Sequence, residues 1–192
     1  QLEALARDFR GVLVIDEAYV DFVEPELGYS ALPLLNRFDN VLILRTFSKG
    51  YSLAGLRMAY GIGPQALIDP MQYKTKDSYN TDFIAQALAL AAISDQDYAA
   101  DTWRKVREQR SSLRSALAAL QLVAPPSQSN FLLATVPEPW NAYALYEGLK
   151  AAGILVRYFK LPGLDDKLRI TVGTADENQR LLRELSRLLQ GG

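Results

Sequence analysis

The chain has 192 residues and a net charge of −1, from 21 Lys and Arg against 22 Asp and Glu, which disfavours nucleic acid and anionic membranes as partners. Its 49% hydrophobic and 22% charged content is typical of a soluble globular protein, and we expect a cytoplasmic location with no membrane span. It contains neither cysteine nor histidine, which excludes disulfides, the usual zinc sites and histidine-based triads, and leaves acid–base chemistry to Lys, Asp, Glu and Tyr.

The first half of the chain predicts a sheet with associated helices. Apolar runs at residues 12–16, 41–47 and 59–63 predict three strands, and their lack of alternation is typical of strands covered on both faces in a mostly parallel sheet. Helices are predicted at 64–73 and 81–94, the second rich in Ala and Leu. We therefore interpret residues 1–96 as the remainder of a large α/β domain.

The second half predicts a smaller α+β domain, residues 97–192, that begins with a long charged helix at about 97–120 connecting the two lobes. In chain order, the later patterns predict a strand at 131–136, a helix at 140–153, strands at 154–159 and 167–173, and a final helix. Thr174 is a plausible N-cap for that last helix, because Glu177 follows it at the spacing of a capping box.

Polar residues follow the first two predicted strands where each strand ends. Asp16 ends the first and Tyr19 follows it, and Thr46, Ser48 and Lys49 end or follow the second. Ligands of open α/β sheets bind at the carboxyl ends of strands. A carboxylate without a partner is costly at the end of an apolar strand. We expect Lys49 to be shielded from water, which favours the neutral, nucleophilic form of its amine.

One cofactor uses all of these groups. Pyridoxal phosphate needs a lysine that attaches to it covalently and a carboxylate on its pyridine nitrogen. It also needs a donor to its phenolate oxygen, which Tyr19 could supply, and hydroxyls and a guanidinium for its phosphate. Thr46, Ser48 and Arg57 are available for the phosphate. The chemistry defines these roles, but the spacing alone does not pair the residues.

The sequence blocks around these residues resemble those of the pyridoxal-phosphate-dependent aminotransferases of fold type I, and among them most of all the histidinol-phosphate aminotransferases. The blocks occur in the order of that family and extend over nearly the whole chain. They are VIDEAYVDF, LRTFSKGYSLAGLRMAYGIG, KDSYNTDFIAQALALAA, SQSNFLL, GILVR and LRITVGT. The resemblance implies an α/β fold with part of the mostly parallel sheet of a large domain, followed by a small α+β domain.

The resemblance also implies roles for individual residues. Lys49 corresponds to the lysine that holds the cofactor, Asp16 to the partner of the pyridine nitrogen, and Tyr19 to the tyrosine of the same block. Ser48 and Arg57 correspond to phosphate-binding residues, and no metal is implied. Two further arginines correspond to substrate-binding residues: Arg169 to the one that binds the amino-acid carboxylate, and Arg157 to one that contacts the distal phosphate.

The implied reaction is the interchange of L-histidinol phosphate and 2-oxoglutarate with imidazole-acetol phosphate and L-glutamate, in histidine biosynthesis. Its partners are then a small-molecule amino donor and a 2-oxo acid, and the full-length enzyme is expected to be a homodimer. The chain begins without Met, and by the resemblance we expect the amino-terminal half of the family to be absent from it. We interpret it as the carboxy-terminal portion of a longer protein and expect it to be inactive alone.

Other readings of the same residues remain. An apolar strand that ends in Asp16 and Glu17 also fits the Walker-B strand of an ATPase, although no G-x-x-x-x-G-K-[ST] motif occurs in the chain. Related enzymes act on aromatic amino acids or decarboxylate threonine phosphate, and a fold analogy does not choose among them. Arg157 and Arg169 could also be surface residues in ion pairs, and Tyr19 could simply pack.

Overall fold

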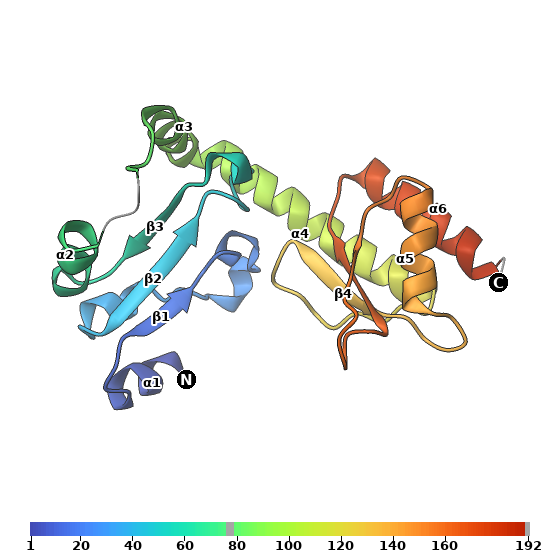
Figure 1. Cartoon of the computed structure of the whole chain (residues 1–192), viewed down its shortest axis with the longest axis horizontal. Helices are drawn as coiled ribbons and strands as arrows, with labels where there is room; N and C mark the ends of the chain where they lie inside the picture. Colours follow the sequence, from blue (N-terminus) through green and yellow to red (C-terminus); the bar gives the residue numbers. More distant parts are fainter. Residues whose placement is uncertain (76–78, 191–192) are drawn as a thin grey trace. The chain divides into compact units, whose positions relative to one another are not determined.

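The computed structural model describes residues 1–75 and 79–190, which form two compact units, Gln1–Thr102 and Trp103–Gly192 (Figure 1). Residues 76–78, with which one of the sequence blocks begins, lie outside the described part. Helix α4 (Gln96–Ala119) contributes residues to both units. Each unit has its own three-stranded sheet and its own hydrophobic cluster, so each is described by itself.

The sheet of the first unit has the strand order β1-β2-β3. Strands β1 (Leu13–Asp16) and β2 (Val41–Thr46) are parallel, and β3 (Ala59–Ile62) runs antiparallel to β2. A parallel pair needs a long crossover, and the β1–β2 connection contains three 3-10 helices: η1 (Val20–Phe22), η2 (Pro25–Leu27) and η3 (Leu32–Asn36). The β2–β3 connection contains only η4 (Ala54–Leu56), which explains the antiparallel third strand.

The two faces of this sheet differ in burial. Ile15, Val41 and Ile43 are buried on one face, packed with Ala6 of helix α1 (Leu2–Asp8) and with residues in and beside η3. On the other face Leu42 is buried, but Val14 is 50% exposed and Leu44 39%. The expectation that both faces are covered therefore holds only in part for the described residues, because α1 and η3 pack on the first face.

Two further helices complete the first unit. Helix α2 spans Gln65–Tyr73, and helix α3 spans Phe83–Ser94, where the carboxylate of Asp82 accepts a hydrogen bond from the Ala85 N–H at 2.8 Å and caps the helix. Helix α3 is apolar on several sides and leaves Phe83 and Ile84 largely exposed. Both helices occur where the sequence predicted them.

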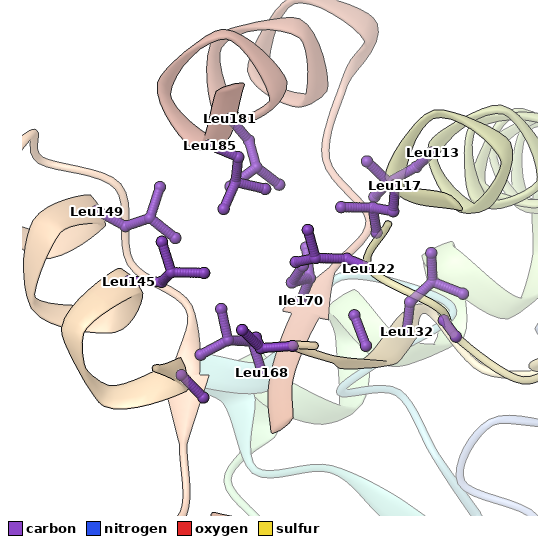
Figure 2. Packing of buried hydrophobic residues seen from close by; sticks show 14 of the residues in the cluster. Leu113, Leu117, Leu122, Leu132, Leu145, Leu149, Leu168, Ile170, Leu181 and Leu185 are labelled. Carbon is purple, nitrogen blue, oxygen red and sulfur yellow. The ribbon is translucent and has the colours of Figure 1, made fainter. Parts of the chain in front are cut away.

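The second unit is an antiparallel sheet in the order β4-β6-β5 with helices packed on it. Its elements are β4 (Phe131–Thr135), α5 (Ala142–Ala151), β5 (Arg157–Tyr158), β6 (Lys167–Thr171) and α6 (Ala175–Gln190). Leucines from α4, β4, α5, β6 and α6 point toward one another in a single cluster (Figure 2). Strand β5 is shorter than the predicted run at 154–159, because only two of its residues pair with β6.

The final helix begins at the predicted capping box. The Thr174 hydroxyl accepts a hydrogen bond from the Glu177 N–H at 3.3 Å, and the Glu177 carboxylate accepts one from the Thr174 N–H at 2.8 Å. These reciprocal bonds satisfy donors that a helix start leaves open, and they lower the pKa of Glu177. Among the described residues, no helix is both long and apolar enough to cross a bilayer.

The leucine cluster of the second unit yields a stability prediction. Leu168 is fully buried, and Leu168→Ala should lower the free energy of unfolding of this unit by about 2–5 kcal/mol, through lost apolar burial and an unfilled cavity. Urea unfolding followed by tryptophan fluorescence measures it, since Trp103 and Trp140 both belong to this unit.

The matched control is Leu155→Ala, because Leu155 is 81% exposed. It should change the free energy of unfolding by no more than about 0.5 kcal/mol. Equal losses in the two variants would contradict the packing described for the cluster.

Candidate functional site

The carboxyl ends of β1 and β2 meet at one edge of the first sheet, because the two strands are parallel. Asp16, the last residue of β1, lies opposite Leu44, and the Glu17 N–H extends the ladder by donating to the Leu44 carbonyl at 2.8 Å. The Asp16 side chain is exposed, and its Oδ1 accepts a hydrogen bond from the Ala18 N–H at 3.0 Å. Asp16 therefore has a partner within its own turn and access to solvent.

The loop after β2 is held by a buried ring and by hydrogen bonds between the Thr46 hydroxyl and the backbone. Phe47 is buried, and its ring centroid lies 5.2 Å from that of Tyr51 and 5.5 Å from that of Tyr60. The Thr46 hydroxyl accepts a hydrogen bond from the Ser48 N–H at 3.0 Å and donates to the Met58 carbonyl at 3.2 Å. Thr46 thus shapes the backbone that carries Ser48 and the residue after it.

Lys49 and Tyr19 are brought together across the strand ends. The Lys49 Nζ lies 5.9 Å from the centroid of the Tyr19 ring, which is a cation–π distance. Lys49 itself is exposed, so the expectation that it is shielded from water is wrong for the described residues. The reason is that the described elements do not enclose its amine.

Ser48 lies near the start of the β2–β3 connection in the sequence, and Arg57 lies near its finish. The φ of Arg57, 54°, lies in the left-handed region, which is uncommon for a residue with a side chain. Its Nη1 donates to the Ala54 carbonyl at 2.9 Å, which ties the guanidinium to η4. Since Thr46 pairs with Ala59 across the hairpin, Ser48 and Arg57 flank the same end of it.

The two other predicted arginines belong to the second unit and lie side by side. Arg157 of β5 is the register partner of Arg169 of β6. Their guanidinium carbons lie 5.3 Å and 5.7 Å from the centroid of the Phe159 ring, and Arg169 also lies 5.1 Å from that of Phe131. Aromatic rings orient guanidinium planes in this way. The paired positive charges are suited to binding an anion.

A buried ion pair lies on the opposite face of the sheet from Asp16, and sequence reasoning missed it. Oε2 of Glu17 accepts a hydrogen bond from Nε of Arg45 at 2.8 Å and forms an ion pair with its Nη2, also at 2.8 Å, and the Glu17 side chain is only 1% exposed. Burial opposes the charge on Arg45, but hydrogen bonds to Glu17 and Tyr60 raise the pKa of the guanidinium overall. The sequence did contain a signal for this ion pair: Asp16 and Glu17 are consecutive acids at a strand end, and consecutive side chains of a strand point to opposite faces, so one of the two had to face the core.

Asp21 is the third charged member of this cluster. Burial, as the main cause, raises the pKa of its carboxyl to about 6; the positive charge of Arg45 opposes the shift, and Glu17 adds to it. Gly50 packs directly against Asp21, because a Cβ built on Gly50 would lie 2.1 Å from Asp21 Oδ2 and 2.8 Å from Asp21 Cβ. Only a glycine fits beside Asp21 at this position, immediately after Lys49.

Comparison with known proteins gives one family. The sequence matches the family described as aminotransferase class I and II over residues 1–185. It is 51% identical over 189 residues to histidinol-phosphate aminotransferase 1 of Nostoc sp. (strain PCC 7120 / SAG 25.82 / UTEX 2576), covering 98% of this chain and 52% of that protein. It is 44% identical over 188 residues to histidinol-phosphate aminotransferase of Microcystis aeruginosa, with the same coverage. The chain spans about half the length of the curated relatives it matches.

Solved structures with the same fold confirm the predicted fold class. The histidinol-phosphate aminotransferase of Sinorhizobium meliloti, solved in complex with pyridoxal-5'-phosphate, matches with a TM-score of 0.87 at 26% identity, over 99% of this chain and 52% of that one. The histidinol-phosphate aminotransferase of Clostridium acetobutylicum matches with a TM-score of 0.88 at 21% identity, over 100% of this chain and 58% of that one. The latter likeness concerns the fold alone.

The raised pKa of Asp21 predicts how stability depends on pH. Between about pH 4 and pH 6 the folded state binds more protons than the unfolded state, so the free energy of unfolding falls as pH rises through this window. Asp21→Asn should remove that fall and raise the free energy of unfolding at pH 7 by about 1–2 kcal/mol, after allowance for partial exposure.

Chemical unfolding at a series of pH values from 4 to 7.5 measures the effect. Asp39→Asn, at an exposed position of the same unit, is the control and should reproduce the parent profile. A difference in the free energy of unfolding between the parent and Asp21→Asn that stayed constant through this window would contradict the assignment to Asp21.

Proposed function

Because the chain belongs to the aminotransferase class I and II family, we propose that its protein is a pyridoxal-phosphate-dependent aminotransferase. The proposed reaction interchanges L-histidinol phosphate and 2-oxoglutarate with imidazole-acetol phosphate and L-glutamate. The names of the curated relatives support this choice of substrate. We propose that the complete protein is a cytoplasmic homodimer.

The observation that carries the proposal is the approach of Lys49 to Tyr19 at the edge where β1 and β2 end. An amine, a phenol and the exposed carboxylate of Asp16 then belong to one edge of one sheet. This is the set of groups that pyridoxal phosphate requires, and the residues present fit it. When bound, the cofactor supplies a protonated ring that delocalises the electron pair left on the substrate carbon.

Each residue at the strand ends has a role in this proposal. Lys49 Nζ would hold the cofactor covalently and, as a free amine, would take the proton from the substrate carbon. Asp16 would keep the pyridine nitrogen protonated, and Tyr19 would donate to the phenolate oxygen. The Ser48 hydroxyl and the Arg57 guanidinium bind the phosphate. Thr46 belongs to the same set, and its bonds to Ser48 and Met58 support a role in shaping this loop.

The second unit supplies the groups proposed for the substrate. Arg169 binds the carboxylate of the amino acid or 2-oxo acid as a two-pronged donor. Arg157 binds the distal phosphate of histidinol phosphate. The support is that the two guanidinium groups are register partners and share the Phe159 ring.

Product analysis tests the substrate. The complete protein, purified with pyridoxal phosphate, is given L-histidinol phosphate, L-phenylalanine or O-phospho-L-threonine with 2-oxoglutarate. Glutamate formed from histidinol phosphate in clear preference to the other two supports the proposal. Carbon dioxide released from O-phospho-L-threonine, with no glutamate formed from histidinol phosphate, would instead indicate a decarboxylase.

The first site prediction concerns Lys49→Ala in the complete protein. Borohydride reduction fixes the cofactor to the amine that holds it, and the variant should show no such adduct because that amine is absent. Mass spectrometry of the digested protein measures the adduct. Lys150→Ala, which removes a surface lysine on α5, should keep the parent adduct. An adduct on a different lysine in the parent protein would refute the assignment.

A second site prediction concerns Asp16→Asn. An amide does not hold the ring nitrogen protonated, so turnover should fall at least about 100-fold while the cofactor stays attached. Steady-state rates and the visible absorption of the bound cofactor measure the two effects separately. Parent-like turnover in Asp16→Asn would remove Asp16 from the mechanism. Asp39→Asn again provides the control, with unchanged turnover expected.

A further inference from the structure

The charged cluster of Glu17, Arg45 and Asp21 connects the two segments that carry the proposed cofactor residues. Glu17 directly follows Asp16, and Arg45 lies on the strand that leads to Lys49. Oε2 of Glu17 bridges the two strand ends through its two 2.8 Å contacts with Arg45. Asp21 adds a second link, because it packs against Gly50 on the other side of Lys49.

The geometry of the sheet separates this cluster from the groups that would touch the cofactor. Side chains alternate between faces along a strand. Glu17 and Arg45 therefore lie on the face of Ile15 and Ile43, whereas Asp16 projects from the opposite face. The cluster acts on the site only through the backbone of the two strand ends.

Stability alone is a weak explanation for such a pair. Removing two charges from water is costly, and apolar residues of similar size often stabilise a fold as well or better. The Glu17 side chain is 1% exposed and that of Arg45 23%, so most of that cost applies here. The contact of two Arg45 nitrogens with Glu17 does, however, define the distance and rotation between the strand ends more narrowly than apolar contacts do.

We propose that Glu17 and Arg45, supported by Asp21 against Gly50, are positioning residues that set the placement of Lys49 relative to Asp16. This inference rests on the proposed function for its chemistry, but the placement of Lys49 is a property of the chain itself. The cluster holds the lysine segment and the carboxylate segment in register. Loss of its charges is expected to let the two segments shift while the sheet remains.

The test compares single and double variants in the complete protein. Glu17→Gln and Arg45→Met each leave one buried group without its charged partner and should lower the melting temperature. The double variant Glu17→Gln/Arg45→Met removes both charges of the pair and should recover the melting temperature when measured at pH 5, where the raised pKa of Asp21 keeps that carboxyl largely protonated. The matched control is Glu3→Gln/Arg37→Met, which removes an exposed 2.6 Å ion pair in the same unit.

Three readouts distinguish positioning from stability. They are the rate of borohydride-trapped cofactor attachment at Lys49, the pH midpoint of the visible band of the bound cofactor, and kcat against KM. A positioning role predicts that the folded double variant still attaches cofactor roughly 10- to 100-fold more slowly, with a shifted midpoint and a loss mainly in kcat. Parent-like values in the double variant would overturn the proposal.

A readout without cofactor keeps this result separate from the proposed function. In cofactor-free protein, the acetylation rate of Lys49 relative to Lys150 should change several-fold in the double variant and remain at the parent value in the control. If the parent protein never attaches cofactor at Lys49, the proposed function fails, and the acetylation ratio alone then decides the positioning role. An acetylation ratio in the double variant equal to that of the parent would overturn the positioning role.

A conservative variant covers the case in which the other variants do not fold. Arg45→Lys keeps the charge but has no planar fork, so it should fold and show a smaller change in the same readouts. Parent-like attachment and acetylation in Arg45→Lys, together with failure of the double variant to fold, would assign the pair to stability and refute the positioning role.

Discussion

The parallel pairing of β1 with β2 is the constraint on which the rest of the candidate site depends. The register from Leu13 opposite Val41 to Asp16 opposite Leu44 brings two strand ends to one edge of the sheet. The Glu17 N–H extends that ladder beyond the strand. Residues that are far apart in sequence, a carboxylate at one end and a lysine after the other, thereby become neighbours. Without this strand pairing, the loops and helices would not bring the carboxylate and the lysine together.

The sequence predicted the elements well where one local signal dominated. Continuous apolar runs marked β1, β2 and β3 to within a residue at each end, and Thr174 with Glu177 marked the start of α6. Strand direction was harder, because the direction of β3 depends on the short β2–β3 connection rather than on its own residues. The length of β5 was overestimated for a similar reason: pairing with β6, not apolar character, decides where it begins and ends.

The sequence predicted which residue types belong to the candidate site, but it did not predict how exposed each side chain is or which charges surround it. The motif around Lys49 predicted a lysine suited to the proposed chemistry, yet its exposure depends on what encloses the strand ends, which no local pattern contains. Asp21 illustrates the converse. Nothing in its sequence neighbourhood marks it, and the rise in its pKa comes mainly from burial, with a smaller contribution from Glu17 and against the opposing charge of Arg45.

Asp16 and Glu17 show how a strand separates two uses of the same functional group. Their carboxylates are chemically alike and adjacent, but the two-residue period of a strand places them on opposite faces. Asp16 is exposed at the edge proposed for the cofactor, and Glu17 is buried against Arg45. A slip of one residue in the β1 register would exchange them, moving Glu17 away from Arg45 and moving Ile15 out of the core to the open face. The loss of the ion pair and of this apolar burial selects against the slip, so the buried pair and the exposed acid specify the same register.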